Sequence, residues 1–185
     1  MEASVLRQSA TILVGLLLIG ATERTLTAQT DSGTYIMRSD VEATTAEGLK
    51  RLQESGRSIS DLMIRHVDVG EENLGVAVVQ RTAREAGGEL RGIVHVELDE
   101  IYYVLSGEGT MVTGGEIEGV QIRDSSLLGP IGSGVMTARG DSRDLKSGDI
   151  VIVPKGVPHA WSEITTETIT YLIFRTDPQK VMNLK

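Results

Sequence analysis

Two stretches of the sequence carry side chains that could together bind a metal ion. His95, Glu97 and Glu100 lie close together in the chain, and His159 ends the stretch 148–159. Residues at positions i and i+2 of a strand point to one face, so a strand here would place His95 and Glu97 side by side. Two imidazoles and one carboxylate with open coordination positions suit non-haem Fe(II), and Mn, Zn and Ni accept similar ligands. These residues therefore predict a site for a divalent transition metal.

The surrounding chain predicts a small all-β domain that would position these side chains. The sequence holds 21 glycines and 4 prolines, together with runs of Val and Ile, which favours strands separated by turns. Short apolar stretches recur about every ten residues, as in a sandwich or barrel. The expected strands cover residues 62–69, 75–82, 92–97, 100–105, 110–113, 135–139, 142–145, 150–153, 159–163 and 168–175. This spacing in one unit indicates a jelly-roll barrel.

Two segments outside these strands have features of their own. Ser39 and Glu42 have the spacing of a capping box, and an amphipathic pattern follows them up to Gly56. They predict one helix that packs on the outside of the barrel. Residues 116–136 are irregular and rich in glycine, which predicts a long loop. Such a loop is either a lid over the barrel mouth or a poorly ordered excursion.

The second stretch resembles a conserved motif of the cupin superfamily. That motif reads G-x5-P-x-G-x2-H-x3-N, and the chain has at the matching positions Gly148, Pro154, Gly156 and His159. Only the last position departs, since Glu163 stands where the family has Asn.

The first stretch is similar to the other cupin motif, G-x5-H-x-H-x3/4-E-x6-G. Glu100 and Gly107 match its second half, and His95 is also present. Glu97 occupies the place of the second histidine, and only two residues separate it from Glu100. The resemblance covers roughly residues 60–175. It implies a single-domain cupin barrel, also called a double-stranded β-helix.

The resemblance also implies roles for these residues. Cupins bind their metal through the motif histidines and glutamate, which implies His95, Glu100 and His159 as ligands and Glu97 as a substitute ligand. Cupins include dioxygenases, isomerases, decarboxylases and lyases, so a metal-dependent enzyme acting on a small organic molecule is expected, with its reaction open. Glu97, if free of the metal, or Tyr102 could move protons. The alternative is a metal-free module that binds a small ligand through its histidines.

Composition and resemblance together bear on the partners. The formal net charge is −8, and no cluster of Lys and Arg is present, which excludes nucleic acid and anionic membrane surfaces as expected partners. Cupins often pair through sheet faces, so the resemblance implies a homodimer. Tyr103 and Leu105 could contribute an apolar outer patch to it. A structural homodimer with a vestigial cavity is a further alternative.

Residues 1–28 have the pattern of a signal peptide. Arg7 precedes an apolar run, and cleavage is expected after Ala28. The run is shorter than the roughly 20 apolar residues of a spanning helix, although an uncleaved anchor and a buried helix are alternatives. The mature protein would be secreted or periplasmic, and the chain has no cysteine for a disulfide. The expected organisation after the signal is an N-terminal extension with the helix at 29–58, the cupin barrel at 59–176 and a C-terminal tail at 177–185.

Two further polar residues lie on expected strands. Arg81 ends one of them, where a surface ion pair is the favoured interpretation and a contact with a carboxylate substrate at the barrel mouth is the alternative. His66 is expected to be a partly exposed strand residue, with a role as a fourth metal ligand as the alternative. The chain has neither a Gly-rich phosphate loop nor a G-x-S-x-G nucleophile motif.

Overall fold

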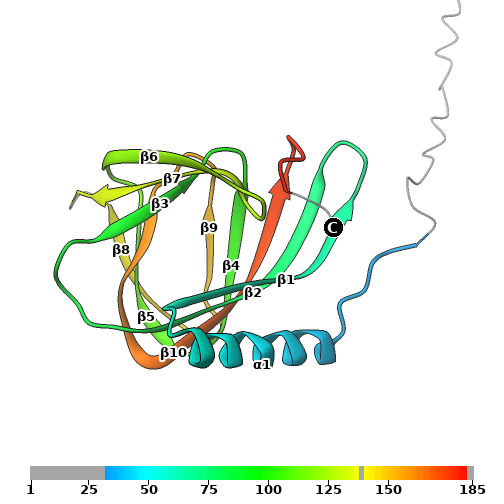
Figure 1. Ribbon diagram of the computed structural model, residues 1–185, viewed down its shortest axis with the longest axis horizontal. Coiled ribbons are helices and arrows are strands. Elements are labelled where there is room, and N and C mark those ends of the chain that lie inside the picture. The colour runs from blue at the N-terminus through cyan, green and yellow to red at the C-terminus, as the bar shows by residue number, and fades with distance from the viewer. Residues whose placement is uncertain (1–31, 138–139, 183–185) are drawn as a thin grey trace, which may run out of the picture.

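The structure, a computed structural model, describes residues 32–137 and 140–182, and the predicted signal peptide lies outside them. One helix lies against the outside of a β-barrel (Figure 1). The elements are α1 (Arg38–Ser55), β1 (Ile59–Asp68), β2 (Asn73–Arg84), β3 (Arg91–His95), β4 (Asp99–Ser106), β5 (Glu108–Thr113), β6 (Ile117–Ser125), β7 (Gly129–Met136), β8 (Asp141–Lys146), β9 (Ile150–Val153) and β10 (His159–Asp177).

Strand β10 belongs to both sheets of the barrel. Its first part pairs with β3 and β5, and its remainder pairs with β2 and β4. One sheet therefore has the order β1-β2-β10-β4-β9, and the other has the order β6-β7-β3-β10-β5-β8. All of these pairs are antiparallel. The predicted jelly-roll barrel, a double-stranded β-helix, is confirmed.

The core lies between the two sheets, and strand β4 shows how alternation along a strand builds it. On β4, Glu100, Tyr102 and Val104 are buried, while Ile101 and Tyr103 are exposed. Other strands supply the remaining members of the main core cluster, which are Val79, Met111, Leu145, Val153, Trp161, Ile164, Ile169, Tyr171 and Ile173. The inward face of β4 therefore changes from apolar to polar at Glu100, and this is where the candidate site lies.

Helix α1 covers the outer face of β1 and β2, as predicted (Figure 1). It ends at Gly56, whose positive φ of 64° closes the last turn. The predicted capping box is wrong, because the helix begins earlier, with Met37 as its N-cap. The Met37 N–H donates to the carboxylate of Asp40 (2.9 Å), while Glu42 pairs with Arg38. No helix in the described part of the chain is long and apolar enough to cross a membrane.

Residues 116–136 form the hairpin of β6 and β7, so the predicted loop or lid is wrong. Strand β7 pairs with β3 and extends the sheet that carries His95. Two of the glycines that suggested a loop lie where strands approach each other closely. A Cβ atom at Gly134 would collide with the carbonyl of Glu118, and one at Gly132 would collide with side chains of β3 and β6. They are strand glycines selected for space rather than for turns.

The sequence predicts two separate strands at 159–163 and 168–175, and this prediction is wrong. Strand β10 is one continuous strand of 19 residues. Its pairing shifts register between Trp161 and Glu163 and again between Ile164 and Thr168. Such bulges let a strand bend and change partners, so the polar middle that suggested a loop is the bend between the two sheets.

Candidate metal centre

The turn between β9 and β10 brings the two motif stretches together. Gly148 and Gly156 have φ values of 95° and 79°, which explains why the motif requires glycine at both positions. The N–H of Gly156 donates to the carbonyl of His95 (2.8 Å), and the N–H of Lys155 donates to the Asp99 carboxylate (2.9 Å). The turn that precedes His159 is therefore fastened to both sides of the bend between β3 and β4.

Three of the predicted ligands converge inside the barrel. His95, Glu100 and His159 are all buried, and they offer ligand atoms that lie within 4.8 Å of one another. Glu100 Oε2 is 3.1 Å from His95 Nε2 and 3.8 Å from His159 Nε2. The two imidazole rings stack with their centroids 5.4 Å apart. No other such group of three ligands occurs within residues 32–137 and 140–182.

Hydrogen bonds fix how His159 faces this centre. Its Nδ1 lies 3.1 Å from the carbonyl oxygen of Val157, which requires the proton on Nδ1. Its Nε2 then presents a lone pair to the centre, the arrangement that metal-binding imidazoles use.

The hydroxyl of Tyr102 lies at the same point. Tyr102 Oη donates to Glu100 Oε2 (2.7 Å) and lies 3.0 Å from His159 Nε2. Tyr102 and Glu100 share the inward face of β4, so two positions of one strand supply both groups. The hydroxyl is therefore placed to exchange a proton with the histidine or the carboxylate.

An arginine that sequence reasoning missed holds the other oxygen of Glu100. Arg175 pairs with Glu100 across the β10–β4 ladder and donates its Nε–H to Oε1 (2.8 Å). Its Nη groups donate to both carboxylate oxygens of Asp61 (2.6 and 3.2 Å). A signal was present in the sequence, because Arg175 continues the inward series of Tyr171 and Ile173. A lone cation on an apolar strand face requires a buried anion.

The burial of the centre and its charges perturb its titrating groups. Burial alone would raise the pKa of Glu100, but Arg175 and the hydrogen bond from His95 hold that pKa well below its usual range. Burial lowers the pKa of His159 to about 4. Burial and the neighbouring carboxylate raise the pKa of Tyr102 well above its usual value. At neutral pH the centre thus holds an ionised carboxylate, a neutral His159 and a protonated phenol.

Glu97 does not join the cluster. Strand β3 ends at His95, and Glu97 lies in the following bend, where it is partly exposed. The argument that His95 and Glu97 share a face is wrong, because the i, i+2 rule holds only while the strand continues. The fully buried side chain of this bend is Leu98. His66, on β1, is half-buried and also lies outside the cluster.

The cluster fits a divalent metal ion. Ligand atoms about 2.0–2.2 Å from one ion are roughly 3.0–3.5 Å apart when they are neighbours in its coordination shell. The Glu100–His95 distance of 3.1 Å lies in this range, and the Glu100–His159 distance of 3.8 Å is slightly longer. In addition, His95 Nδ1 is buried without a hydrogen-bond partner in the described part of the protein. Among the described residues, the polar contact of the His95 ring is therefore made by Nε2, the nitrogen that faces Glu100.

A barrel of two antiparallel sheets with a buried His/Glu/His cluster defines the class of double-stranded β-helix proteins. The sequence profile of the cupin family matches residues 51–185, so the chain belongs to the cupin family.

Comparison with solved structures adds distant likenesses. The DMSP lyase DddQ from Ruegeria pomeroyi is 20% identical, with 69% of this chain and 51% of that chain covered and a TM-score of 0.41. A protein with a double-stranded β-helix domain from Klebsiella pneumoniae is 18% identical, with 67% and 80% covered and a TM-score of 0.41. The Co(II) form of HppE is 17% identical, with 64% and 52% covered and a TM-score of 0.40. The chain spans about half the length of DddQ and HppE. No curated protein matches the sequence.

Proposed function

We propose that the protein binds one divalent transition metal ion through His95, Glu100 and His159 and acts on a small organic molecule there. The observation that carries this proposal is the convergence of three buried ligand atoms within 4.8 Å from three different strands. An ionised carboxylate so deeply buried is costly unless cations and hydrogen bonds surround it. Fe, Mn, Zn and Ni all suit this donor set.

In this function each residue near the ion has a separate task. The ion would act as a Lewis acid on an oxygen of the substrate. Tyr102 Oη, between Glu100 and His159, would hold the proton that the reaction transfers. Glu97, the other predicted proton carrier, is less well placed because it lies in the bend outside the cluster. The reaction type, whether oxygenase, isomerase or lyase, is set by the substrate.

A second candidate function is a metal-free module that binds a small ligand. The observation in its favour is that the polar groups of the centre already bond to one another. Tyr102 donates to Glu100, and His95 Nε2 lies 3.1 Å from the same carboxylate. A neutral ligand could then bind beside this network without any ion.

Elemental analysis of untagged protein, purified without added metal, separates the two candidates. The metal-dependent function predicts close to one transition metal ion per chain, and the loss of that ion in His159→Ala. Protein that is metal-free and cannot be loaded with Fe, Mn, Zn or Ni would exclude it. His66→Ala is the matched control, since this half-buried histidine lies outside the cluster and its loss should leave the metal content unchanged.

We further propose that two copies of the chain pair through the outer face of the β9–β4–β10 sheet. This face is not covered by α1, which lies over β1 and β2. Large apolar side chains are exposed on it, namely Ile101, Tyr103, Ile150, Ile152 and Phe174. They are neighbours, because Ile101 pairs with Ile152 on β9 and with Phe174 on β10. An apolar patch of this kind on a soluble surface is typical of an interaction site.

Light scattering coupled to gel filtration tests the dimer. Ile152→Lys places a charge in the middle of the patch and should convert the dimer to a monomer. Ile122→Lys is the control, since Ile122 is similarly exposed (60% against 67%) but lies on β6 in the other sheet. A wild-type monomer at micromolar concentration would contradict the proposal.

Export follows from the sequence pattern of residues 1–28 alone, and we propose a secreted or periplasmic protein that associates with neither membranes nor nucleic acid after signal cleavage. N-terminal sequencing of the protein recovered from a bacterial periplasmic fraction tests this, with Gln29 expected as the first residue. Recovery of the intact N-terminus from the membrane fraction would indicate an uncleaved anchor.

A further inference from the structure

Within the part of the chain that the structure describes, Arg81 is a half-buried cation without a carboxylate partner. Its Nε–H donates to the hydroxyl of Tyr171 (2.9 Å). Neither Nη group has a hydrogen-bond or ion-pair partner among residues 32–137 and 140–182. The predicted surface ion pair is therefore wrong. A guanidinium taken partly out of water without a counter-ion is unfavourable unless a ligand supplies one.

The buried and half-buried acids of the barrel interior, Asp61 and Glu100, are engaged by Arg175. Asp61 attracts Arg81 electrostatically, but it accepts two hydrogen bonds from Arg175. Glu100 accepts a third from the same arginine. A divalent ion at the centre would add further positive charge to this interior. The balance of charge therefore favours a ligand that brings an anionic group to Arg81.

Arg81 is connected to the metal centre through a layer of aromatic rings. Tyr171, its hydrogen-bond partner, packs on Tyr102 with ring centroids 5.2 Å apart and on Trp161 at 5.7 Å. Tyr102 in turn lies 3.0 Å from His159.

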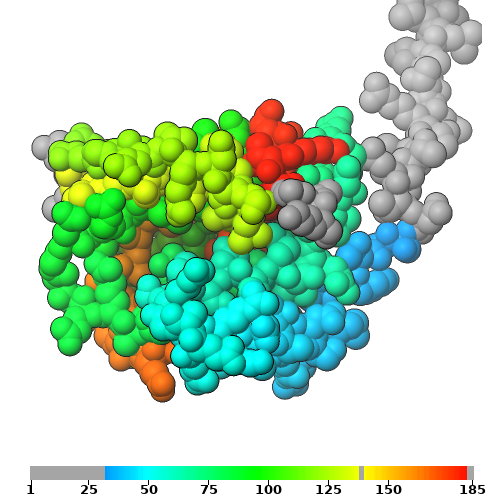
Figure 2. Space-filling model, in the orientation of Figure 1, coloured from blue at the N-terminus to red at the C-terminus, as the bar shows by residue number. Residues whose placement is uncertain are grey.

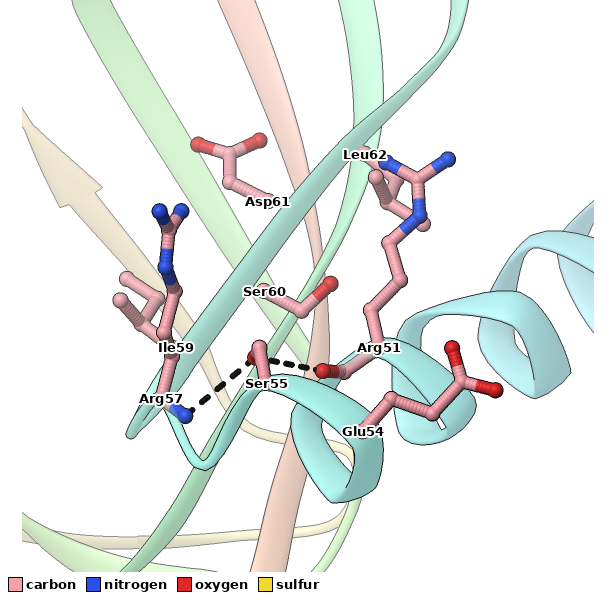
Figure 3. Close-up of a pocket in the computed structure, with 8 residues that line it drawn as sticks. All are labelled: Arg51, Glu54, Ser55, Arg57, Ile59, Ser60, Asp61 and Leu62. Atoms are coloured by element: carbon pink, nitrogen blue, oxygen red, sulfur yellow. Dashed lines mark hydrogen bonds between the residues drawn. The ribbon is translucent and has the colours of Figure 1, made fainter.

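Solvent reaches the barrel end where Arg81 lies. Arg81 is paired with Ile59 at the start of β1. Ile59 and Asp61 line a surface cavity of about 330 Å³, in which Asp61 and Ser60 point to opposite sides of the strand (Figure 3). Figure 2 shows that the surface is hollowed between the helix and the β6–β7 hairpin. Arg81 does not itself line this cavity, but its side chain is only half-buried, so a small molecule could approach it from outside.

We propose that Arg81 is the anchor for the carboxylate of a small organic acid, whose other end reaches the His95/Glu100/His159 centre. This assignment rests on the proposed function, because the other end of the ligand is expected to reach the metal ion. It names small organic acids as the substrate class of that function. A carboxylate matches the two free Nη groups, which can donate to both of its oxygens.

Binding of paired acids and amides tests this anchor. The probes are acetate, propionate and benzoate, each with its amide, titrated by calorimetry into metal-free and Mn-loaded protein. Wild type should bind at least one acid about 10-fold or more tightly than its amide, and Arg81→Gln should lose that preference. Arg81→Lys should keep part of it. The control is Arg123→Gln on β6, an exposed arginine whose loss should change nothing.

The outcomes separate this inference from the proposed function. The metal-free protein keeps Arg81, so a preference for acids there supports the anchor even if no ion binds. Equal binding of all three acids and their amides to wild type would overturn it, as would an unchanged preference in folded Arg81→Gln. If Arg81→Gln does not fold, the Nε–H resonance of Arg81 in wild type decides, since a binding carboxylate must shift it and its amide must not.

Discussion

Two arginines in one barrel have opposite surroundings. Arg175 is 2% exposed and donates to two carboxylates, whereas Arg81 is half-buried and, among the described residues, donates to a phenol alone. Both side chains carry the same charge, so the difference lies in what the strands place opposite them. Arg175 faces Glu100 across the β10–β4 ladder, while Arg81 faces the apolar residues Ile59 and Ile169. A fully paired arginine fixes the centre, and an incompletely paired one leaves donors for a ligand.

We expect the largest loss of stability when Arg175 is replaced. Arg175→Met leaves Asp61 and Glu100 buried without their shared cation, which should lower the free energy of unfolding by about 3–5 kcal/mol. Urea denaturation monitored by tryptophan fluorescence measures this, since Trp161 lies in the core. A loss of less than about 1 kcal/mol in the free energy of unfolding would mean that the contacts of Arg175 with Asp61 and Glu100 do not act as buried ion pairs.

The second prediction concerns the pH dependence of stability. The groups with shifted pKa values, His159 and Glu100, lie in the centre that Arg175 contacts. The folded pKa of His159 is about 4, below its unfolded value of 6.5, so the unfolded chain takes up this proton first as the pH falls. Stability is complete above pH 6.5 and is lost toward pH 4, by about 3 kcal/mol. The lowered pKa of Glu100 adds a further loss in the acidic range.

Denaturation of metal-free protein at several pH values measures this loss. His159→Gln should flatten the curve between pH 6.5 and 4, while Arg81→Met should keep most of the slope, because Arg81 is the weakest of the influences on the pKa of His159. A wild-type stability that stays constant over this window would contradict a buried, neutral His159.

The two tyrosines extend the comparison. Tyr102→Phe removes a hydrogen bond to an ionised carboxylate and should cost about 2 kcal/mol of stability. Tyr171→Phe removes the bond from the half-buried Arg81, which joins no carboxylate, and should cost about 1 kcal/mol. Thermal unfolding of the two single variants and the double variant gives both values. The reverse order would show that Arg81 is the more tightly held arginine.

The smallest effect is expected at Arg81 itself. Arg81→Met should change the free energy of unfolding by no more than about 1 kcal/mol, because no buried acid loses its partner. The same urea experiment measures it. A loss as large as that of Arg175→Met would mean that Arg81 is a structural ion rather than a ligand anchor.

The sequence predicts those features of the fold and the site that depend on neighbouring residues, and it fails for those that depend on distant ones. The turn before His159 is a local pattern, because Gly148 and Gly156 must adopt positive φ and the motif letters report that directly. It predicts the fold and one ligand. His95 and Glu100 follow from the motif in the first stretch, which is also a local pattern. Local pattern fails at Glu97, since nothing in its neighbourhood shows that β3 stops at His95.

The remaining failures come from pairing between distant segments. Arg175 meets Asp61 across 114 positions of the chain, and only the barrel brings them together. The glycines of 116–136 resemble a loop until Gly134 is seen against the carbonyl of Glu118. Arg175 and Gly134 are thus each explained by a residue that is close in space on another strand, and the spacing of residues in the sequence does not show which strands are neighbours.

The central claim is that His95, Glu100 and His159 form a metal centre, and a Co(II) titration tests it most directly. Metal-free wild type should bind one Co(II) per chain and develop visible absorption from His and carboxylate ligation, as should His66→Ala. Folded His159→Ala should lose this absorption. Wild type that binds no Co(II), or an identical spectrum in folded His159→Ala, would contradict the assignment.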